Sequence, residues 1–260
     1  MIAKPRLLLV VPCHNEASRL RPDAFLHFLA SGCDTGLLFV DDGSTDATPA
    51  ILADLAERGM GRIEVLTLPR NVGKAAAVQR GVLAALDQTP ELVGYWDADL
   101  STPLTALPEF LDVLKTHPEI DIVMGARVKL LGRDIRRRPV RHYLGRAFST
   151  AASLTLSLGV YDTQCGAKVF RASPPVKRVF ATPFEAQWIF DVEILSRYIA
   201  VTGMAECQSR VIELPLKTWT DVPGSKLRAR HAIRAMWDLA VIWRRLSGVR
   251  REERRPNTGV

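Results

Sequence analysis

The feature that most constrains the fold is the regular alternation of short apolar runs and amphipathic segments in the first hundred residues. Residues 6–12 and 36–44 carry branched apolar runs that end in polar clusters, a pattern typical of buried parallel strands. Residues 16–32 between them space their apolar side chains as a helix does. The alternation continues with strands expected at 62–69 and 92–100 and helices at 44–59 and 72–86. It predicts an α/β fold with a doubly wound, mostly parallel sheet and right-handed crossovers.

A polar cluster follows each of these four predicted strands. The clusters are PCHNE, DDGSTD, RNVGKA and DADLSTP, in chain order. Ligands of open α/β sheets bind at the carboxyl ends of the strands, so we expect all four clusters to meet at one edge of the sheet. The candidate site residues within them are Pro12, Asn15, Glu16, Asp41, Asp42, Lys74, Asp97 and Asp99.

Asp97 and Asp99 are two like charges separated by one residue at the end of a predicted buried strand. Their mutual repulsion disfavours ionisation of both unless a cation lies between them. Mg²⁺ or Mn²⁺ suits this pair, because these ions take few protein oxygens and leave coordination positions for phosphate. A solvated turn is the alternative for such a triplet. The apolar run VGYW just before it favours the metal site.

The other clusters allow a structural and a functional interpretation. Asp42 or Ser44 is a candidate N-cap for the next helix, with Thr45 as a further candidate. One cap needs one residue, however, and the pair Asp41 and Asp42 leaves a carboxylate that can accept a hydrogen bond from the imide N–H of uracil.

Two further candidates lie at expected helix starts. Asn15 and Glu16 either cap the helix that follows them or contact the base or sugar of a nucleotide. Lys74 begins a helix whose N-terminus favours anions, which indicates contact with a diphosphate.

Charge and hydropathy divide the 260-residue chain into three parts: a folded α/β domain at 1–226, an amphipathic basic helix at 227–248 and a disordered tail at 249–260. Residues 226–255 hold ten basic and three acidic side chains, which equals the whole net charge of +7. The apolar runs are shorter than the roughly 18 to 20 residues that cross a bilayer. The four cysteines show no metal-binding spacing. We expect a cytoplasmic protein with reduced thiols.

The basic helix is the candidate for contact with a membrane. Residues 227–246 place Ala229, Ile233, Met236, Ala240 and Trp243 along one face. Such a helix either lies on an anionic leaflet, as a peripheral protein on the cytoplasmic face, or packs on the α/β domain.

The ordered motifs resemble glycosyltransferase family 2, the inverting nucleotide-sugar enzymes of GT-A fold. The resemblance covers about residues 1–227. Three later motifs, DTQCGAKVF at 162–170, WIFDVEIL at 188–195 and TWTDVPGSKL at 218–227, resemble the dolichyl-phosphate β-glucosyltransferase branch. The resemblance implies an inverting, metal-dependent transfer of a hexose, glucose from UDP-glucose, onto a polyprenyl or dolichyl phosphate, with Mg²⁺ or Mn²⁺ as cofactor.

The resemblance also implies roles for individual residues. Asp42 would hold the base, and Asp97 with Asp99 would bind the metal and the diphosphate. Asp191 would be the catalytic acidic residue on the acceptor side. Arg127 and Arg141 would face an acceptor phosphate. The implied nucleotide-sugar site comprises Pro12, Asn15, Glu16, Asp41, Asp42, Lys74, Asp97, Gln164 and Lys168.

Three other functions compete with this one. The same fold can serve a soluble hydroxyl acceptor, which requires Asp191 as a true general base, whereas a phosphate with a second pKa of about 6 is already ionised. A nucleotidyltransferase would usually carry a glycine-rich loop after the first strand, and VVPCHNE has no glycine. A nucleic-acid partner is not expected, because the acidic edge repels a phosphate backbone.

Overall fold

The computed structural model describes residues 5–32, 34–136, 139–222 and 229–253. Its centre is a seven-stranded sheet in the order β3-β2-β1-β4-β7-β5-β8, which is mostly parallel as predicted. β6 and β9 form a separate two-stranded sheet. The strands are β1 (Leu7–Cys13), β2 (Thr35–Asp41), β3 (Ile63–Thr67), β4 (Leu92–Trp96), β5 (Ile122–Ala126), β6 (Asp134–Arg136), β7 (Ala167–Arg171), β8 (Val211–Pro215) and β9 (Thr218–Thr220).

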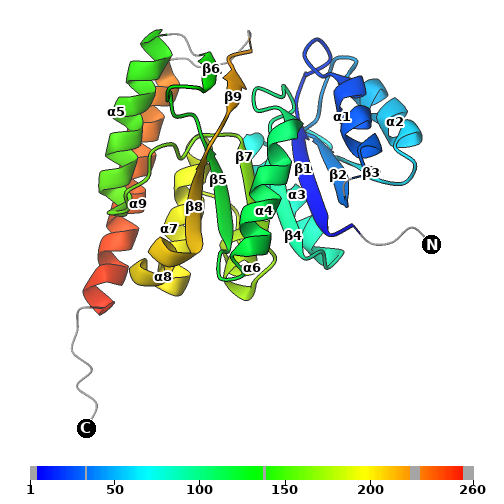
Figure 1. Ribbon diagram of the computed structural model, residues 1–260. Coiled ribbons are helices and arrows are strands. Elements are labelled where there is room, and N and C mark those ends of the chain that lie inside the picture. Colours follow the sequence, from blue (N-terminus) through cyan, green and yellow to red (C-terminus); the bar gives the residue numbers. More distant parts are fainter. Residues whose placement is uncertain (1–4, 33, 137–138, 223–228, 254–260) are drawn as a thin grey trace.

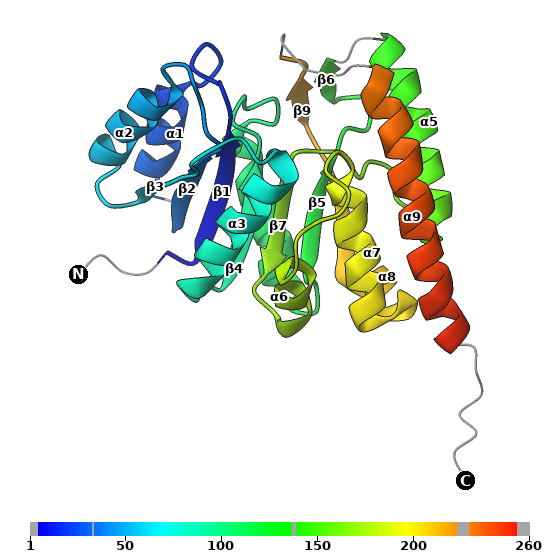
Figure 2. The same cartoon turned by 180° about the vertical axis from the view of Figure 1, so that it is seen from behind.

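Helices cover both faces of the large sheet (Figures 1 and 2). Because strand side chains alternate between faces, Leu8 and Val10 of β1 enter one core while Leu7 and Leu9 enter the other. α3, α6 and α7 pack on the first face, and α1, α2 and α4 on the second. The helices are α1 (Pro22–Ala30), α2 (Thr48–Arg58), α3 (Lys74–Asp87), α4 (Leu107–Thr116), α5 (Pro139–Leu156), α6 (Pro174–Phe180), α7 (Phe190–Thr202), α8 (Met204–Arg210) and α9 (Ala229–Glu253).

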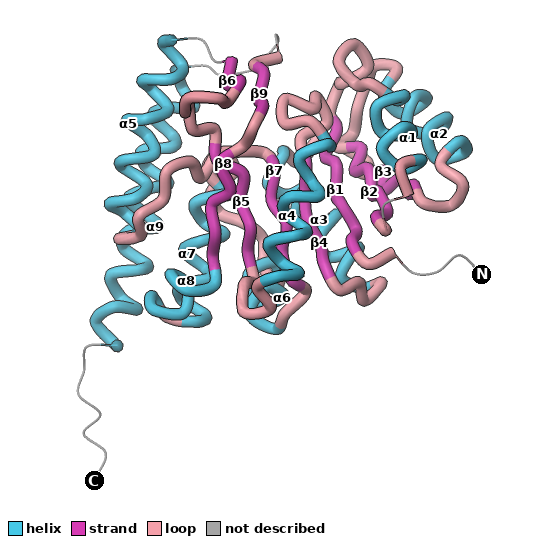
Figure 3. The backbone as a smooth tube through the Cα atoms, in the orientation of Figure 1, coloured by secondary structure: helices cyan, strands magenta, loops and turns pink. Residues whose placement is uncertain are grey.

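β7 is the exception to the parallel arrangement. It runs antiparallel between β4 and β5, and its register places Lys168 opposite both Tyr95 and Met124. A strand from residues 167–171 thus separates two strands that follow each other in the chain (Figure 3). This insertion brings the DTQCG motif, which directly precedes β7, beside the end of β4.

The predicted helix caps are wrong. α2 begins at Thr48, after both Ser44 and Thr45, and the carboxylate that accepts the Thr48 backbone N–H, at 2.9 Å, belongs to Asp46. α1 begins at Pro22, so Asn15 and Glu16 lie too far upstream to cap it. The loops after β1 and β2 are longer than periodicity indicated, because they carry the polar clusters past the edge of the sheet before each helix begins.

α9 packs beside α5 along one end of the sheet (Figures 1 and 2). Its buried side chains are Ala235, Asp238, Leu239, Ile242 and Leu246, whereas Met236, Ala240 and Trp243 of the predicted apolar face point outward. The helix continues to Glu253, beyond the predicted end at 248 and into the predicted tail. Residues 227–228 and 254–260 lie outside the described part. Among the residues that are described, no helix is sufficiently long and apolar to cross a membrane.

Candidate active site

The polar clusters after β1, β2, β3 and β4 meet at one edge of the sheet, as the topology predicts. The Asn15 backbone N–H donates to Ser44 Oγ at 3.0 Å, which joins the first two loops. The Val72 backbone N–H donates to Asp42 Oδ1 at 2.7 Å, which joins the second and third. Lys74 then contacts Asp97 after β4. Residues from four separate segments therefore form one continuous rim.

The residues predicted after β1 have partners inside this rim. Asn15 adopts a left-handed backbone conformation, with φ of 53°, and its Oδ1 accepts the Thr45 backbone N–H at 2.8 Å. The Glu16 backbone N–H donates to Thr48 Oγ1 at 2.9 Å, and its carboxylate pairs with Arg19. Pro12 lies within β1 and pairs with Val40. These contacts shape the loop, and a direct contact with a nucleotide stays a prediction.

Asp41 and Asp42 are both buried and both bind backbone N–H groups. Asp41 Oδ1 accepts the Ser44 N–H at 3.0 Å. Asp42 accepts the Val72 and Gly73 N–H groups at 2.7 and 2.9 Å, one on each carboxylate oxygen. Asp42 therefore holds the loop that leads into α3. Each carboxylate oxygen has a further lone pair, so this role is compatible with the predicted contact to uracil.

Asp97 and Asp99, the acidic doublet, lie at the carboxyl end of β4, and Lys74 neutralises part of their charge. Lys74 Nζ lies 2.5 Å from Asp97 Oδ1, and the Asp97 side chain is 32% exposed. The Ser101 backbone N–H donates to Asp99 Oδ1 at 3.0 Å. Partial burial disfavours the charge on Lys74, but the carboxylates of Asp97, Asp191 and Asp99 outweigh that effect and raise its pKa. Lys74 therefore lies within electrostatic range of both the doublet and Asp191.

The backbone of Gly166 packs against the Asp97 carboxylate. The Asp97 backbone N–H donates to Gly166 O at 2.9 Å. A Cβ added at position 166 would lie 1.8 Å from Asp97 Oδ2, so only glycine leaves room for the carboxylate. The G of the DTQCG motif is thus explained by its contact with a candidate metal ligand.

Asp191 lies in the first turn of α7, within electrostatic range of Lys74. Its Oδ1 accepts hydrogen bonds from Tyr95 Oη and from Lys168 Nζ, the latter at 2.6 Å. Its side chain is 8% exposed. The N-terminus of a helix also favours a carboxylate. Two hydrogen-bond donors and a helix N-terminus therefore surround the Asp191 side chain.

Lys168 is fully buried in the structure, and a contact with the nucleotide sugar stays a prediction. Its side chain is 0% exposed, and its ammonium donates to Thr163 O, Cys165 O and Asp191 Oδ1. Gln164 lies in the same turn, and its side-chain nitrogen is buried without a hydrogen-bond partner among the described residues. Of the two predicted residues, Gln164 keeps a donor that a ligand can use.

Arg127 has a partner within the chain rather than an open position facing an acceptor. Its Nε and Nη2 donate to the two oxygens of Asp162 at 2.6 and 2.7 Å, and the pair is largely buried. Burial opposes the charge, but Asp162 raises the pKa of Arg127 above its ordinary value. The Tyr161 and Asp162 backbone N–H groups donate to Glu213, each at 2.7 Å. The Arg141 side chain lies outside the described part of the structure.

Sequence reasoning missed Tyr95, Asp162 and Glu213 as members of this region. Asp162 opens the DTQCG motif, so the motif itself held that signal. Tyr95 and Glu213 belong to strands whose periodicity indicates only burial, and their roles depend on which neighbours the sheet gives them.

Comparison with known proteins defines the class of this fold and site. The family model described as glycosyl transferase family 2 matches residues 8–174, and the chain belongs to that family of glycosyltransferases. Among curated relatives, a dolichyl-phosphate β-glucosyltransferase of Trichomonas vaginalis is 31% identical, with 90% of this chain and 69% of the relative covered. The enzyme of that name from Mus musculus is 32% identical, with 85% and 69% covered.

Solved structures confirm the GT-A fold. Glucosyl-3-phosphoglycerate synthase from Mycobacterium tuberculosis, in complex with Mn²⁺ and UDP-glucose, matches with a TM-score of 0.67 at 19% identity. The match covers 99% of this chain and 82% of that chain. A complex of the same synthase with Mn²⁺, UDP and glucosyl-3-phosphoglycerate matches with a TM-score of 0.64.

Proposed function

We propose that this chain transfers glucose from UDP-glucose to a polyprenyl phosphate of the dolichyl type, with inversion at the anomeric carbon and with a divalent metal. The observation that carries the proposal is the arrangement of Asp97, Asp99, Lys74 and Asp191 around one end of β4. The relatives named dolichyl-phosphate β-glucosyltransferase support the acceptor, and the Mn²⁺ and UDP-glucose complex of the structural neighbour supports the donor.

The residues present fit a divalent metal. Asp97 and Asp99 offer hard oxygen ligands, and Asp97 is set in a cradle that a single Cβ at position 166 would fill. No group of three His, Cys, Asp or Glu side chains is gathered to hold a metal within the described residues. Mg²⁺ and Mn²⁺ suit such a sparse site, because water and substrate phosphates complete their coordination. When bound, the ion would neutralise the departing nucleoside diphosphate.

The protein's own residues then have distinct tasks. Lys74 balances the doublet without a ligand and is close enough to turn toward a diphosphate at the start of α3. Asp42 shapes the loop expected to hold the base. The buried side-chain nitrogen of Gln164, which has no hydrogen-bond partner among the described residues, is a candidate donor to the nucleotide sugar. Asp191 stands on the acceptor side. A phosphate acceptor is already ionised near neutral pH, so Asp191 would orient it rather than deprotonate it.

The exposed face of α9 supports contact with a lipid surface. Trp237 and Trp243 are 68% and 53% exposed, and Met236 lies with them. Arg234 and Arg244 are also exposed on this helix. Exposed tryptophans among arginines suit the interface of an anionic leaflet. The same helix packs on α5 and α7. Its buried apolar side chains are Ala235, Leu239, Ile242 and Leu246, so packing and membrane contact would use different side chains.

The test is an assay of purified protein with Mg²⁺ or Mn²⁺, a panel of UDP- and GDP-sugars, and vesicles with or without polyprenyl phosphate. We expect nucleotide release that requires UDP-glucose, the metal and the lipid phosphate together. Release that proceeds equally without lipid but requires a soluble hydroxyl compound would refute the lipid acceptor. In that case Asp191→Asn should lower turnover by about 10²-fold or more, as loss of a general base does.

A further inference from the structure

The buried ammonium of Lys168 is fully used inside the chain. Its Nζ lies 2.9 Å from Thr163 O, 2.7 Å from Cys165 O and 2.6 Å from Asp191 Oδ1. A lysine ammonium has three N–H donors, so these acceptors satisfy it completely. A buried charge is costly unless it is paired and hydrogen-bonded. The chain meets that cost here with contacts to two different parts of the candidate site.

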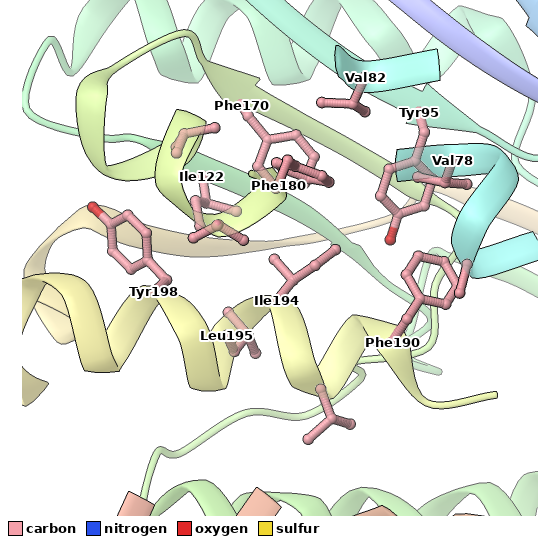
Figure 4. Packing of buried hydrophobic residues seen from close by; sticks show 14 of the residues in the cluster. Val78, Val82, Tyr95, Ile122, Phe170, Phe180, Phe190, Ile194, Leu195 and Tyr198 are labelled. Atoms are coloured by element: carbon pink, nitrogen blue, oxygen red, sulfur yellow. The ribbon is translucent and has the colours of Figure 1, made fainter. Parts of the chain in front are cut away.

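The first part of the candidate site that Lys168 contacts is Asp191. Tyr95 lies opposite Lys168 in the antiparallel pairing of β4 with β7, and its hydroxyl donates to the same Oδ1 of Asp191. Burial and then the charge of Asp191 raise the pKa of Tyr95, so the phenol stays protonated and remains a donor. Figure 4 shows Tyr95 beside Phe190, at the start of α7. Two fixed donors from adjacent strands therefore orient one carboxylate.

The second part of the candidate site that Lys168 contacts is the turn at 163–166, which packs against Asp97. The two carbonyls that Lys168 binds belong to the turn at 163–166, which ends in Gly166. Gly166 O accepts the Asp97 backbone N–H at 2.9 Å, and its missing side chain makes room for the Asp97 carboxylate. A shift of this turn would therefore move the backbone against which the Asp97 carboxylate packs.

We propose that Lys168 and Tyr95 are positioning residues that hold Asp191 and, through the turn at 163–166, Asp97 in one fixed arrangement. This rests on the proposed function, in which Asp97 serves the donor and Asp191 the acceptor. The network makes the donor and acceptor halves of the site interdependent, although it contacts neither substrate.

The first experiment compares Tyr95→Phe with Tyr198→Phe. Both tyrosines are fully buried and both donate to a buried aspartate, Tyr198 to Asp121 Oδ2 at 2.6 Å. Figure 4 shows them at opposite ends of the same core. Each variant loses one buried hydrogen bond, so both should be destabilised alike. We expect only Tyr95→Phe to lower kcat, about tenfold, with the KM for UDP-glucose unchanged. Equal kcat in the two variants would overturn the role of Tyr95.

The second experiment uses Lys168→Met combined with Asp191→Asn, because Lys168→Met alone leaves an unpaired buried carboxylate and is strongly destabilising. Asp191→Asn is the reference, because the Lys168 ammonium then keeps two backbone carbonyls and an amide oxygen as acceptors. We expect Asp191→Asn to bind UDP with Mn²⁺ within about twofold of the unmodified protein, measured by calorimetry. The double variant should bind about tenfold more weakly, as expected when the turn loses its hydrogen bonds. Equal affinities would contradict the link to Asp97.

Amide hydrogen exchange gives a readout that does not depend on the proposed function. In the double variant we expect exchange at residues 163–166 and at Asp97 to be at least about tenfold faster than in Asp191→Asn. Unchanged exchange would refute the proposal even if the protein transfers glucose. A protein that binds no UDP with Mn²⁺ but shows the faster exchange would refute the proposed function and support the network.

Discussion

At the scale of single residues, the position of the Asp97 carboxylate depends on the missing side chain of Gly166 as much as on its partners. Gly166 presents only its backbone to Asp97, at a distance where any Cβ would collide with Oδ2. Lys74 approaches the other carboxylate oxygen. The Asp97 carboxylate thus lies between the backbone of Gly166 and the ammonium of Lys74, and each of these two residues can be changed separately.

Gly166→Ala should displace the Asp97 carboxylate. We expect the affinity for UDP with Mn²⁺ to fall at least about tenfold and the free energy of unfolding to fall by about 1 to 3 kcal/mol, as for other overpacked sites. Calorimetry and denaturant titration measure the two effects. Gly159→Ala is the control, because a Cβ there meets nothing within 4 Å. Equal binding by both variants would show that the glycine at position 166 does not position the metal ligand.

Lys74→Met should separate the two tasks assigned to Lys74. Without the competing ammonium, Mn²⁺ alone should bind about two- to fivefold more tightly, because a partly exposed ion pair contributes up to about 1 kcal/mol. UDP should bind more weakly in the presence of Mn²⁺, because its diphosphate loses a cation. Titration followed by electron paramagnetic resonance measures free Mn²⁺. Lys177→Met, at an exposed position on α6, should change neither affinity. Weaker binding of Mn²⁺ alone would argue against competition at Asp97.

Residue identity predicted which side chains gather at the rim, but not what each one binds. Asp42 and Lys168 both lie in the motifs that the sequence singled out, yet the structure gives each of them partners inside the chain. The backbone partners of Asp42 and the Asp191 partner of Lys168 lie 23 to 31 residues away in the chain. Local patterns carry no information on such contacts, because the contacts depend on how the sheet places distant turns.

At the scale of elements, α9 is attached through a seam that is only partly apolar. A cavity of about 410 Å³ lies between α9 and the segment around α7, lined by charged residues from both sides, including Glu193, Arg234, Asp238 and Arg245. The Oδ2 atom of Asp238 is buried there without a hydrogen-bond partner among the described residues. Burial raises the pKa of Asp238, Arg234 lowers it, and Glu193 raises it further, with a net increase.

Asp238→Asn should therefore stabilise the protein in a pH-dependent manner. The raised pKa means that the folded state favours the neutral carboxyl, so the stability from this group is present at low pH and is lost as the pH rises through the raised pKa. We expect the variant to have a Tm about 2 to 4 °C higher at pH 8 and an equal Tm near pH 4, the size expected for relief of about 1 kcal/mol. Thermal unfolding at several pH values measures this.

Asp112→Asn, at an exposed position on α4, is the matched control and should leave Tm unchanged at every pH. A lower Tm of Asp238→Asn at pH 8 would show that the carboxylate is stabilising in the seam.

Helices and strands with a clear repeat of apolar residues were predictable from the sequence, whereas very short strands were not. β1 to β4 and α1 to α3 follow from apolar spacing over long segments. β6 and β9 have three residues each, too few for a period to appear. For α9 the helical period was predictable, but which of its faces packs on the domain was not, because apolar side chains lie both on the packed face and on the exposed face with Met236 and Trp243.

At the scale of the whole molecule, the exposed apolar side chains of α5 and α9 lie on two helices that run side by side. Tyr143, Leu144 and Leu154 of α5 and Met236, Trp237 and Trp243 of α9 are all exposed. A membrane-bound acceptor would have to reach the rim from such a surface. The proposed contact with lipid would therefore involve both helices.

Trp237→Glu combined with Trp243→Glu should reduce binding to vesicles that contain anionic lipid. We expect the bound fraction in a sedimentation assay to fall at least about tenfold, because two interfacial side chains are replaced by charges that the leaflet repels. Thermal stability should be nearly unchanged, since both side chains are more than half exposed. Met60→Glu, at a methionine that is 77% exposed after α2, should bind as the unmodified protein does. Unchanged binding by the double variant would exclude this face of α9.

The fold class and the position of the site were predictable because both follow from the order of strands and polar clusters along the chain. The antiparallel β7 was not, because nothing in residues 167–171 indicates which strands will flank them.

That insertion sets an order of assembly. During synthesis, β4 and β5 emerge from the ribosome first, but each lacks its shared neighbour until residues 167–171 arrive. A nascent chain that stops before that point exposes an unpaired edge and lacks the glycine that backs Asp97. The first half of this protein therefore lacks the strand that joins β4 to β5, and we expect a gene cut near its middle to yield two fragments that need each other.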